Sequence, residues 1–232
     1  MKRWPYVLSE EETLDAVLEG ASIARYGDGE FKLCHGSSIR SQGFSPLLGK
    51  LLRHILHAQV DGLLVGIPNL IVPTKPFWDQ FRTPRITQLF DMKRSYASAF
   101  ISRPDSAPWI NCRAYWDKVE RLWKGKAVTL VRGSGKSLTP DLLASAHSVR
   151  EIPCARQHAF VEREELLKKI GKPSGPVLLC CGPTATVLAY DLAQRGIHGV
   201  DLGHLGMFYK RRDKPVAQAL AEGRAEEKEA EA

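Results

Sequence analysis

Two acidic residues, Asp28 and Glu30, alternate with two glycines, Gly27 and Gly29, directly after a short apolar segment. The glycines allow a sharp backbone turn, and a tight turn would let both carboxylates reach one divalent cation, directly or through water. Such a cation keeps coordination positions for the oxygens of a diphosphate. Taken alone, the pattern also fits an ordinary structural turn with no ligand. Arg25, just before it, could hold a phosphate or could simply pair with Asp28 or Glu30.

A second candidate is the glycine-rich segment 131–137 (VRGSGKS), which also follows an apolar run. A nucleotide-binding P-loop requires a glycine five positions before the one that precedes its lysine, and Leu130 occupies that place. The segment could still offer backbone N–H groups, Ser134, Lys136 and Ser137 to a phosphate. A tight strand-to-helix turn with a solvated lysine explains it equally well.

The third candidate is the start of a predicted helix after the apolar run 177–181. Gly182 eases the approach to the helix, Pro183 fixes its first turn and Thr184 suits a cap, so unpaired N–H groups could face an anion. An N-capped helix with nothing bound fits the same residues.

Asp201 and His204 stand at the end of the last apolar run. An aspartate and a histidine after a terminal strand are well placed to bind a ligand or to transfer a proton. A single histidine is more often a structural residue.

All of these candidates follow apolar runs typical of buried strands. We expect strands at 22–26, 62–68, 97–101, 127–131, 148–152, 177–181 and 199–202. We expect helices at about 9–19, from Ser45-Pro46 onward, and near 113–123, 139–146, 160–170 and 184–195. Strands that alternate with helices pair in parallel through crossovers, which predicts an α/β fold with a Rossmann-like, doubly wound, mostly parallel sheet. Ligands bind such sheets beyond the carboxyl ends of the strands, where the candidate residues would meet.

The composition is that of an ordinary globular protein, with 232 residues and 44% hydrophobic side chains. We expect one domain over 1–212 and a flexible Ala/Glu-rich tail, or a frayed helix, over 213–232.

The net charge of +7 suits an anionic small molecule, a membrane surface or nucleic acid. Because the basic residues are scattered and no zinc spacing or RNA-binding signature occurs, we expect no nucleic-acid partner. The sequence leaves open whether the protein contacts a membrane surface and whether it forms a homo-oligomer.

The five cysteines include no Cys-x-x-Cys spacing, which is typical of a reduced, intracellular protein. The first residues contain no apolar leader, and no stretch reaches the roughly 18 apolar residues that a membrane span requires. We therefore expect a cytoplasmic protein, with contact to the inner face of the cell membrane left open.

Taken together, these blocks resemble the GT-D type glycosyltransferases, a family first defined as a domain of unknown function. The similarity rests on 25–30, the turn at Arg132 and Gly133, 182–192 and 201–204, and it runs from about residue 20 to 209. It implies a Rossmann-like fold, a nucleotide-sugar donor, namely a uridine diphosphate (UDP) sugar, and a divalent metal, manganese or magnesium.

The resemblance also implies a role for each candidate residue. The metal ligands would be Asp28 and Glu30, with Asp201 and His204 as further catalytic candidates at the rim of the site. The residues implied near the nucleotide are Arg25, Gly27, Gly29, Arg132, Gly133, Gly182, Pro183 and Thr184.

The implied activity is metal-dependent transfer of a hexose to a glycan, glycolipid or glycoprotein acceptor in bacterial surface polysaccharide or adhesin assembly. One departure stands out: the family carries acidic residues before an aromatic after the Gly-His pair, whereas 205–209 reads LGMFY. This leaves His204 and Asp201 as the candidates for the base. Two alternatives are a non-catalytic subunit that binds sugar nucleotides in a polysaccharide assembly complex and a P-loop-like nucleotide kinase.

Overall fold

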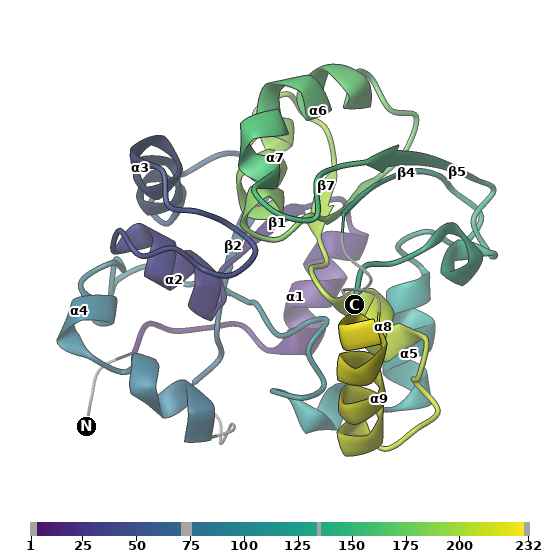
Figure 1. The fold of residues 1–232 in the computed structure, drawn as a ribbon, viewed down its shortest axis with the longest axis horizontal. Coiled ribbons are helices and arrows are strands. Elements are labelled where there is room, and N and C mark those ends of the chain that lie inside the picture. Colours follow the sequence, from purple (N-terminus) through teal and green to yellow (C-terminus); the bar gives the residue numbers. More distant parts are fainter. Residues whose placement is uncertain (1–3, 71–75, 134–135, 230–232) are drawn as a thin grey trace.

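The computed structural model describes residues 4–70, 76–133 and 136–229. Within these residues seven strands form one sheet in the order β3-β2-β1-β7-β6-β4-β5, and every neighbouring pair is parallel (Figure 1). The strands are β1 (Ser22–Arg25), β2 (Leu63–Ile67), β3 (Ala97–Ser98), β4 (Ala127–Arg132), β5 (Ser148–Pro153), β6 (Val177–Cys180) and β7 (Gly199–Asp201). The predicted α/β class with a parallel sheet is confirmed.

Helices cover both faces of the sheet, with α6 and α7 on one side and α1 and α5 on the other (Figure 1). The α-helices are α1 (Glu10–Leu18), α2 (Asp28–Cys34), α3 (Pro46–Ile55), α4 (Pro84–Thr87), α5 (Arg113–Glu120), α6 (Arg163–Ile170), α7 (Pro183–Ala193), α8 (Leu205–Tyr209) and α9 (Val216–Glu229). Short 3₁₀ helices occur at Pro76–Phe81, Pro108–Ile110, Pro140–Leu143 and Ala159–Glu162. Helix α7 is buried along its whole length, as expected for the helix that packs on the central strands.

Local signals in the sequence explain where two helices begin. Ser9 and Glu12 form the predicted capping box at the start of α1, where Ser9 N donates to Glu12 Oε2 (2.8 Å). Ser45 caps α3, and Pro46 occupies its first turn. These caps pair N–H groups that a helix start otherwise leaves without partners.

Three elements differ from the prediction. The run after Gly27 is the start of helix α2 and not a tight turn, because Gly27 and the Glu30 side chain close a cap around its first N–H groups. The helix expected near 139–146 is only the 3₁₀ turn Pro140–Leu143, and the strand expected at 97–101 pairs over Ala97–Ser98 alone.

The order in which the chain adds strands to the sheet reverses beside β1. The chain moves from β1 outward to β2 and β3, whereas the later strands fill the opposite side and end with β7 against β1. In open α/β sheets such a reversal leaves a crevice beyond the carboxyl ends of the two strands. The residues that follow β1 and β7 therefore face a common space.

The Ala/Glu-rich segment that we expected to be flexible or frayed is helix α9 over Val216–Glu229. It packs on α8, with Ala219 buried. The buried Arg211 donates to Glu222 Oε2 (3.1 Å) and pairs with Glu226, so charged contacts tie α9 to the preceding residues. That residues 1–212 form a single domain stays a prediction.

None of the helices in the described ranges combines the length and the apolar character needed to cross a bilayer.

Candidate active site

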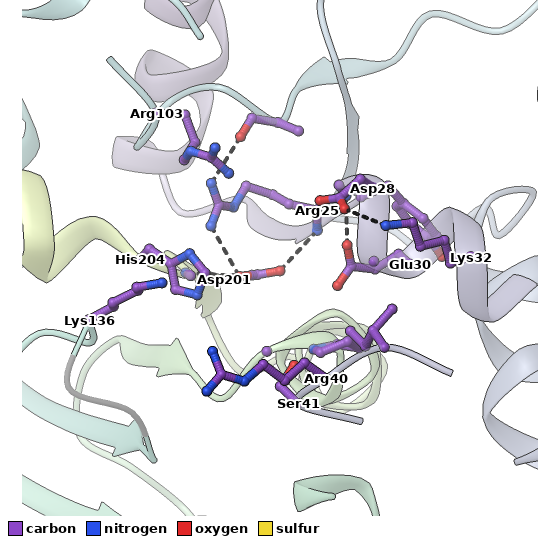
Figure 2. Close-up of a pocket in the computed structure, with 18 of the residues that line it drawn as sticks. Arg25, Asp28, Glu30, Lys32, Arg40, Ser41, Arg103, Lys136, Asp201 and His204 are labelled. Carbon is purple, nitrogen blue, oxygen red and sulfur yellow. Dashed lines mark hydrogen bonds and ion pairs between the residues drawn. The ribbon is translucent and has the colours of Figure 1, made fainter. Parts of the chain in front are cut away.

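A cavity of about 1260 Å³ lies at the carboxyl ends of the central strands (Figure 2). Most of the residues singled out in the sequence line it: Arg25, Gly27, Asp28, Gly29, Glu30, Gly182, Pro183, Asp201 and His204. Lys136 lines it as well, whereas Arg132, Gly133, Ser137 and Thr184 are not among its lining residues. The topology thus brings together segments that are up to 179 residues apart in the sequence, from Arg25 to His204.

A buried ion pair joins the ends of β1 and β7. Arg25 Nη2 donates to Asp201 Oδ1 (3.2 Å), and the Arg25 backbone N–H donates to Asp201 Oδ2 (3.2 Å). Arg25 Nη1 donates to Ser102 Oγ (2.5 Å) and to the Ala99 carbonyl (2.9 Å). Pairing with Asp28 or Glu30, one of the two roles considered for Arg25, is therefore wrong, because the guanidinium pairs with Asp201 at the end of the neighbouring strand β7. Contact with a phosphate stays a prediction. Burial raises the pKa of Asp201, while the contacts with Arg25 oppose that rise.

Glu30 turns its carboxylate back toward the start of α2. Its Oε2 accepts the Gly27 backbone N–H (2.7 Å), which caps the helix. Burial raises the pKa of Glu30 to about 7, the charges of Asp201 and Asp28 add to the rise, and the Gly27 hydrogen bond opposes it. A carboxyl group with this pKa changes its charge in the physiological range.

Asp28 is more exposed and forms an ion pair with Lys32, Nζ to Oδ2 at 3.1 Å (Figure 2). No group of three or more His, Cys, Asp or Glu residues in the described ranges is arranged to hold a metal. Asp28 and Glu30 both line the cavity, and carboxylate oxygens suit hard cations such as magnesium and manganese. Two carboxylates fit a cation whose remaining ligands come from a bound phosphate and water, as is usual for magnesium.

His204 is exposed to the cavity and lies beside Asp201 and Lys136 (Figure 2). The protein around the ring lowers the pKa of His204, and the cations Arg103, Lys136 and Arg25 lower it further. The imidazole is therefore neutral at pH 7, and with a pKa of about 3 it is a weak base in this structure.

The start of α7 contributes backbone to the cavity. Gly182, with φ +59, occupies the left-handed region that favours glycine, and Pro183 follows in the first turn. A side chain at Gly182 would approach only Ser41 Oγ, at 4.0 Å, so the need for glycine is conformational. Thr184 is fully buried, and its Oγ1 has no hydrogen-bond partner among the described atoms.

The glycine-rich loop after β4 is only partly at the site. Arg132 Nη1 donates to Glu151 Oε1 (2.9 Å), and a side chain at Gly133 would collide with the Ala155 carbonyl at 2.7 Å. Lys136 lines the cavity, whereas Ser137 is buried and donates to the Cys180 carbonyl (2.9 Å). Ser134 and Gly135, also part of the predicted phosphate loop, lie outside the described residues.

Several lining residues were missed in the sequence because they lie in irregular segments. They are Arg40, Ser41, Arg103, Arg156 and Gln157. Arg103 is held by Asp105, which accepts from Nε (2.7 Å) and from Nη2 (2.9 Å). The Arg-x-Asp spacing is a local signal for such a fork, but nothing in the sequence indicates that it faces the cavity.

The cavity is cationic. Six basic residues line it against three acidic ones: Arg25, Lys32, Arg40, Arg103, Lys136 and Arg156, against Asp28, Glu30 and Asp201. Figure 2 shows Arg103 and Arg40 on opposite sides of this space, with Lys136 beside His204. A recess of this charge, beside a helix start, suits an anion with more than one phosphate.

Comparisons with known proteins agree with this geometry. Residues 23–220 match the family described as the glycosyltransferase GT-D fold. A probable glycosyl transferase, Gly, from Streptococcus gordonii is 30% identical over 224 residues, which is 88% of this chain and 32% of that protein. The glycosyltransferase GlyD of Streptococcus pneumoniae serotype 4 is 31% identical over 86% of this chain and 27% of its own length. The chain thus spans about a third of the length of these curated relatives.

Solved structures show the same fold. One, described as domain of unknown function 1792 with a distinct glycosyltransferase fold, has a TM-score of 0.80 and 32% identity, covering 90% of this chain and 82% of that one. Another, described as a new glycosyltransferase from Streptococcus sanguinis, has a TM-score of 0.76 and 32% identity over 89% of this chain and 84% of that one. With a family match across most of its length and the same parallel sheet, the chain belongs to the GT-D fold glycosyltransferases.

Proposed function

We propose that this chain transfers a hexose from a UDP-sugar to a glycan, glycolipid or glycoprotein acceptor in the assembly of bacterial surface polysaccharides or adhesins. The observation that carries the proposal is the cationic cavity at the β1/β7 reversal, with Asp28 and Glu30 in its wall. Membership of the GT-D family supports the reaction class. We infer the donor, acceptor and metal from this family membership, and the charge of the cavity supports an anionic donor.

Stabilising the diphosphate that leaves the sugar is the main catalytic task in such a reaction. A divalent cation, manganese or magnesium, held by Asp28 and Glu30 would neutralise part of that charge when bound. Arg103, fixed by Asp105, and Lys136 add cations that need little rearrangement to meet the phosphates. The start of α7 offers backbone N–H groups to the same anion.

The acceptor hydroxyl must lose its proton during transfer. We assign this role to His204 because its ring lines the cavity, and the negative charge of a bound diphosphate would raise its lowered pKa and strengthen it as a base. Asp201 is buried and engaged with Arg25, so we assign it a positioning role at the junction of β1 and β7.

The test is a calorimetric titration of UDP into the protein, with manganese and then with a chelator. We expect binding that depends on the metal and that the double variant Asp28→Asn with Glu30→Gln loses. The matched control is Asp79→Asn, whose carboxylate is outside the cavity and 70% exposed. Equal binding without metal and in the double variant would make the two carboxylates structural.

The alternatives give different results in the same assays. A P-loop kinase would lose nearly all activity in Lys136→Ala, whereas a glycosyltransferase responds more strongly to changes at Asp28 and Glu30. A non-catalytic subunit would bind the UDP-sugar without hydrolysing it or transferring its sugar to any acceptor.

A further inference from the structure

Helix α8 connects the cavity to the last helix of the chain. It has five residues, begins directly after His204 and packs against α9 (Figure 1). All five of its residues are buried. The family match ends at residue 220, so most of α9 lies beyond it, and the proposed transfer reaction gives α9 no role.

The start of α8 is fixed against the segment that carries Lys136. The Met207 backbone N–H donates to the Lys136 carbonyl (3.1 Å). Gly206 lies so close to the same segment that a Cβ there would overlap the Ser137 carbonyl, so only glycine fits. Both Lys136 and His204 line the cavity. A shift of α8 would therefore move two groups of the cavity together.

Arg211 joins α8 to α9. Its Nη1 donates to the Met207 carbonyl (3.0 Å), one of the carbonyls that the end of a helix leaves without a partner inside the helix. Its Nε donates to Glu222 Oε2 (3.1 Å), and its Nη2 pairs with Glu226. The Arg211 side chain is only 4% exposed, so its charge depends on these two carboxylates for compensation. We call these three side chains, Arg211, Glu222 and Glu226, the Arg211 clasp.

The two helices also meet through a contact without charge. The Gly223 backbone approaches Met207 so closely that a Cβ at Gly223 would overlap the Met207 Cγ. Met207 thus contacts α9 through its side chain and its carbonyl, and it contacts the Lys136 segment through its N–H. The contacts are continuous from α9 to the wall of the cavity.

We infer that the Arg211 clasp holds Lys136 and His204 in position for the transfer reaction. Its three side chains lie outside the cavity, so they are positioning residues and not catalytic ones. The inference rests on the proposed function, which assigns Lys136 to the leaving diphosphate and His204 to the acceptor proton. Groups that stabilise a developing charge act best when they need little rearrangement, and a displacement of about 1 Å can lower a rate by about 10²-fold. Because hydrogen bonds to a guanidinium are directional, the clasp fixes the register between α8 and α9 more closely than apolar packing would.

The test variant is Glu222→Gln with Glu226→Gln, which removes both carboxylates of the clasp. Calorimetric titration of UDP with manganese should show an affinity at least about fivefold below that of the wild type, because the change reaches the site through α8. The matched control is Asp117→Asn with Glu165→Gln, which carries the same change in net charge. Asp117 pairs with Arg113 and Glu165 with Lys169, and all four of these side chains are more than half exposed. Thermal unfolding of each variant sets a titration temperature at which all are folded.

A double-mutant cycle separates positioning from a loss of stability. In Lys136→Ala there is no ammonium left to displace, so adding the two changes in the clasp should alter the UDP affinity by less than about twofold. A clasp that only stabilises α9 would lower the Tm and leave the UDP affinity unchanged. An equal loss of affinity in the wild-type and Lys136→Ala backgrounds would show that the clasp does not act through Lys136. Either result overturns the inference.

A second variant and a second readout do not depend on these charges or on UDP. Gly223→Ala keeps every charge of the clasp, but its Cβ must displace Met207, so it should weaken UDP binding as well. The imidazole nitrogen signals of His204, assigned by NMR through His204→Gln and recorded without ligand, should shift in both clasp variants and not in the control. Absence of UDP binding in the wild type would refute the donor site, and the His204 signals would still decide the role of the clasp. Unchanged His204 signals overturn the inference in either case.

Discussion

Arg25 and Asp201 form an ion pair of 3.2 Å between the carboxyl ends of β1 and β7, and both side chains are less than a tenth exposed. The same aspartate accepts the Arg25 backbone N–H, so one carboxylate fixes both the main chain and the side chain of its partner. The pair therefore sets the shape of the cavity floor.

Replacing one partner of this pair should cost stability, because it leaves the other charge buried without compensation. For Asp201→Asn we expect a loss of about 3 kcal/mol in the free energy of unfolding, measured by urea denaturation. Asp79→Asn, which removes the ion pair between the exposed Asp79 and Arg82, should change the free energy of unfolding by less than about 1 kcal/mol. Equal effects of the two variants would show that the buried pair adds nothing to the fold.

Glu30 should make the stability of the metal-free protein depend on pH. Its pKa of about 7 in the folded protein exceeds the ordinary 4.5, so folding favours the protonated form. This contribution is complete below about pH 4.5 and disappears as the pH rises through 7. We expect the Tm of the wild type to fall relative to that of Glu30→Gln between pH 5 and 8. A constant difference over this range would contradict the shifted pKa.

The same group should govern binding of the metal and UDP. Below pH 7 a cation must displace a proton from Glu30, so we expect the affinity for UDP with manganese to weaken up to about tenfold per pH unit. Titrations between pH 5.5 and 8 measure this slope. Glu30→Gln should bind weakly at every pH, and a slope that survives in this variant would have to come from another group.

Arg103 should contribute to binding of the leaving diphosphate. We expect Arg103→Gln to lower kcat/KM for donor hydrolysis by about 10²-fold, since it removes a fixed cation from the cavity. Arg103→Lys should recover only part of this loss, because an ammonium cannot keep the two-point contact with Asp105. Arg113→Gln serves as the control, and full activity in Arg103→Lys would show that charge alone suffices.

Gly203 offers a test of how closely Arg25 must be packed. A Cβ at Gly203, where φ is +50, would lie 2.6 Å from Arg25 Nη2, whereas one at Gly62, with φ +70, meets nothing within 4 Å. Both alanine variants carry the backbone strain of about 1 kcal/mol, but only Gly203→Ala should also weaken UDP binding. Calorimetry and urea denaturation on the two variants separate the strain from the displacement of Arg25. Equal UDP affinity in both variants would show that the position of Arg25 does not matter for UDP binding.

The sheet could be predicted from the sequence because its strands are short apolar runs between amphipathic helices. The run 177–181 and the segment 183–193 are examples, since both are buried and both are rich in apolar and small residues. The start of α2 could not be predicted, because two glycines suppress the helical signal. The cap that restores it depends on Glu30 folding back on Gly27. Gly29 leaves room for Ile39 Cδ1, which lies 3.0 Å from where a Cβ would stand.

The basic wall of the cavity was beyond prediction for a different reason. Arg40, Arg103 and Arg156 lie in irregular segments with no period, and only the strand order brings them to one space. Arg132 and Gly133 show the converse, since their sequence context suggested a ligand and the structure gives them protein partners, Glu151 and the 154–155 backbone.

The placement of β7 beside β1 has a consequence for biosynthesis. Asp201 is 176 residues away from Arg25, so the whole of this intervening segment must leave the ribosome before the two residues can pair and the cavity floor can close. Contacts of such long range form late in folding. An incomplete chain therefore has no closed floor to engage the donor, and ligand binding reports that the last strand has been inserted.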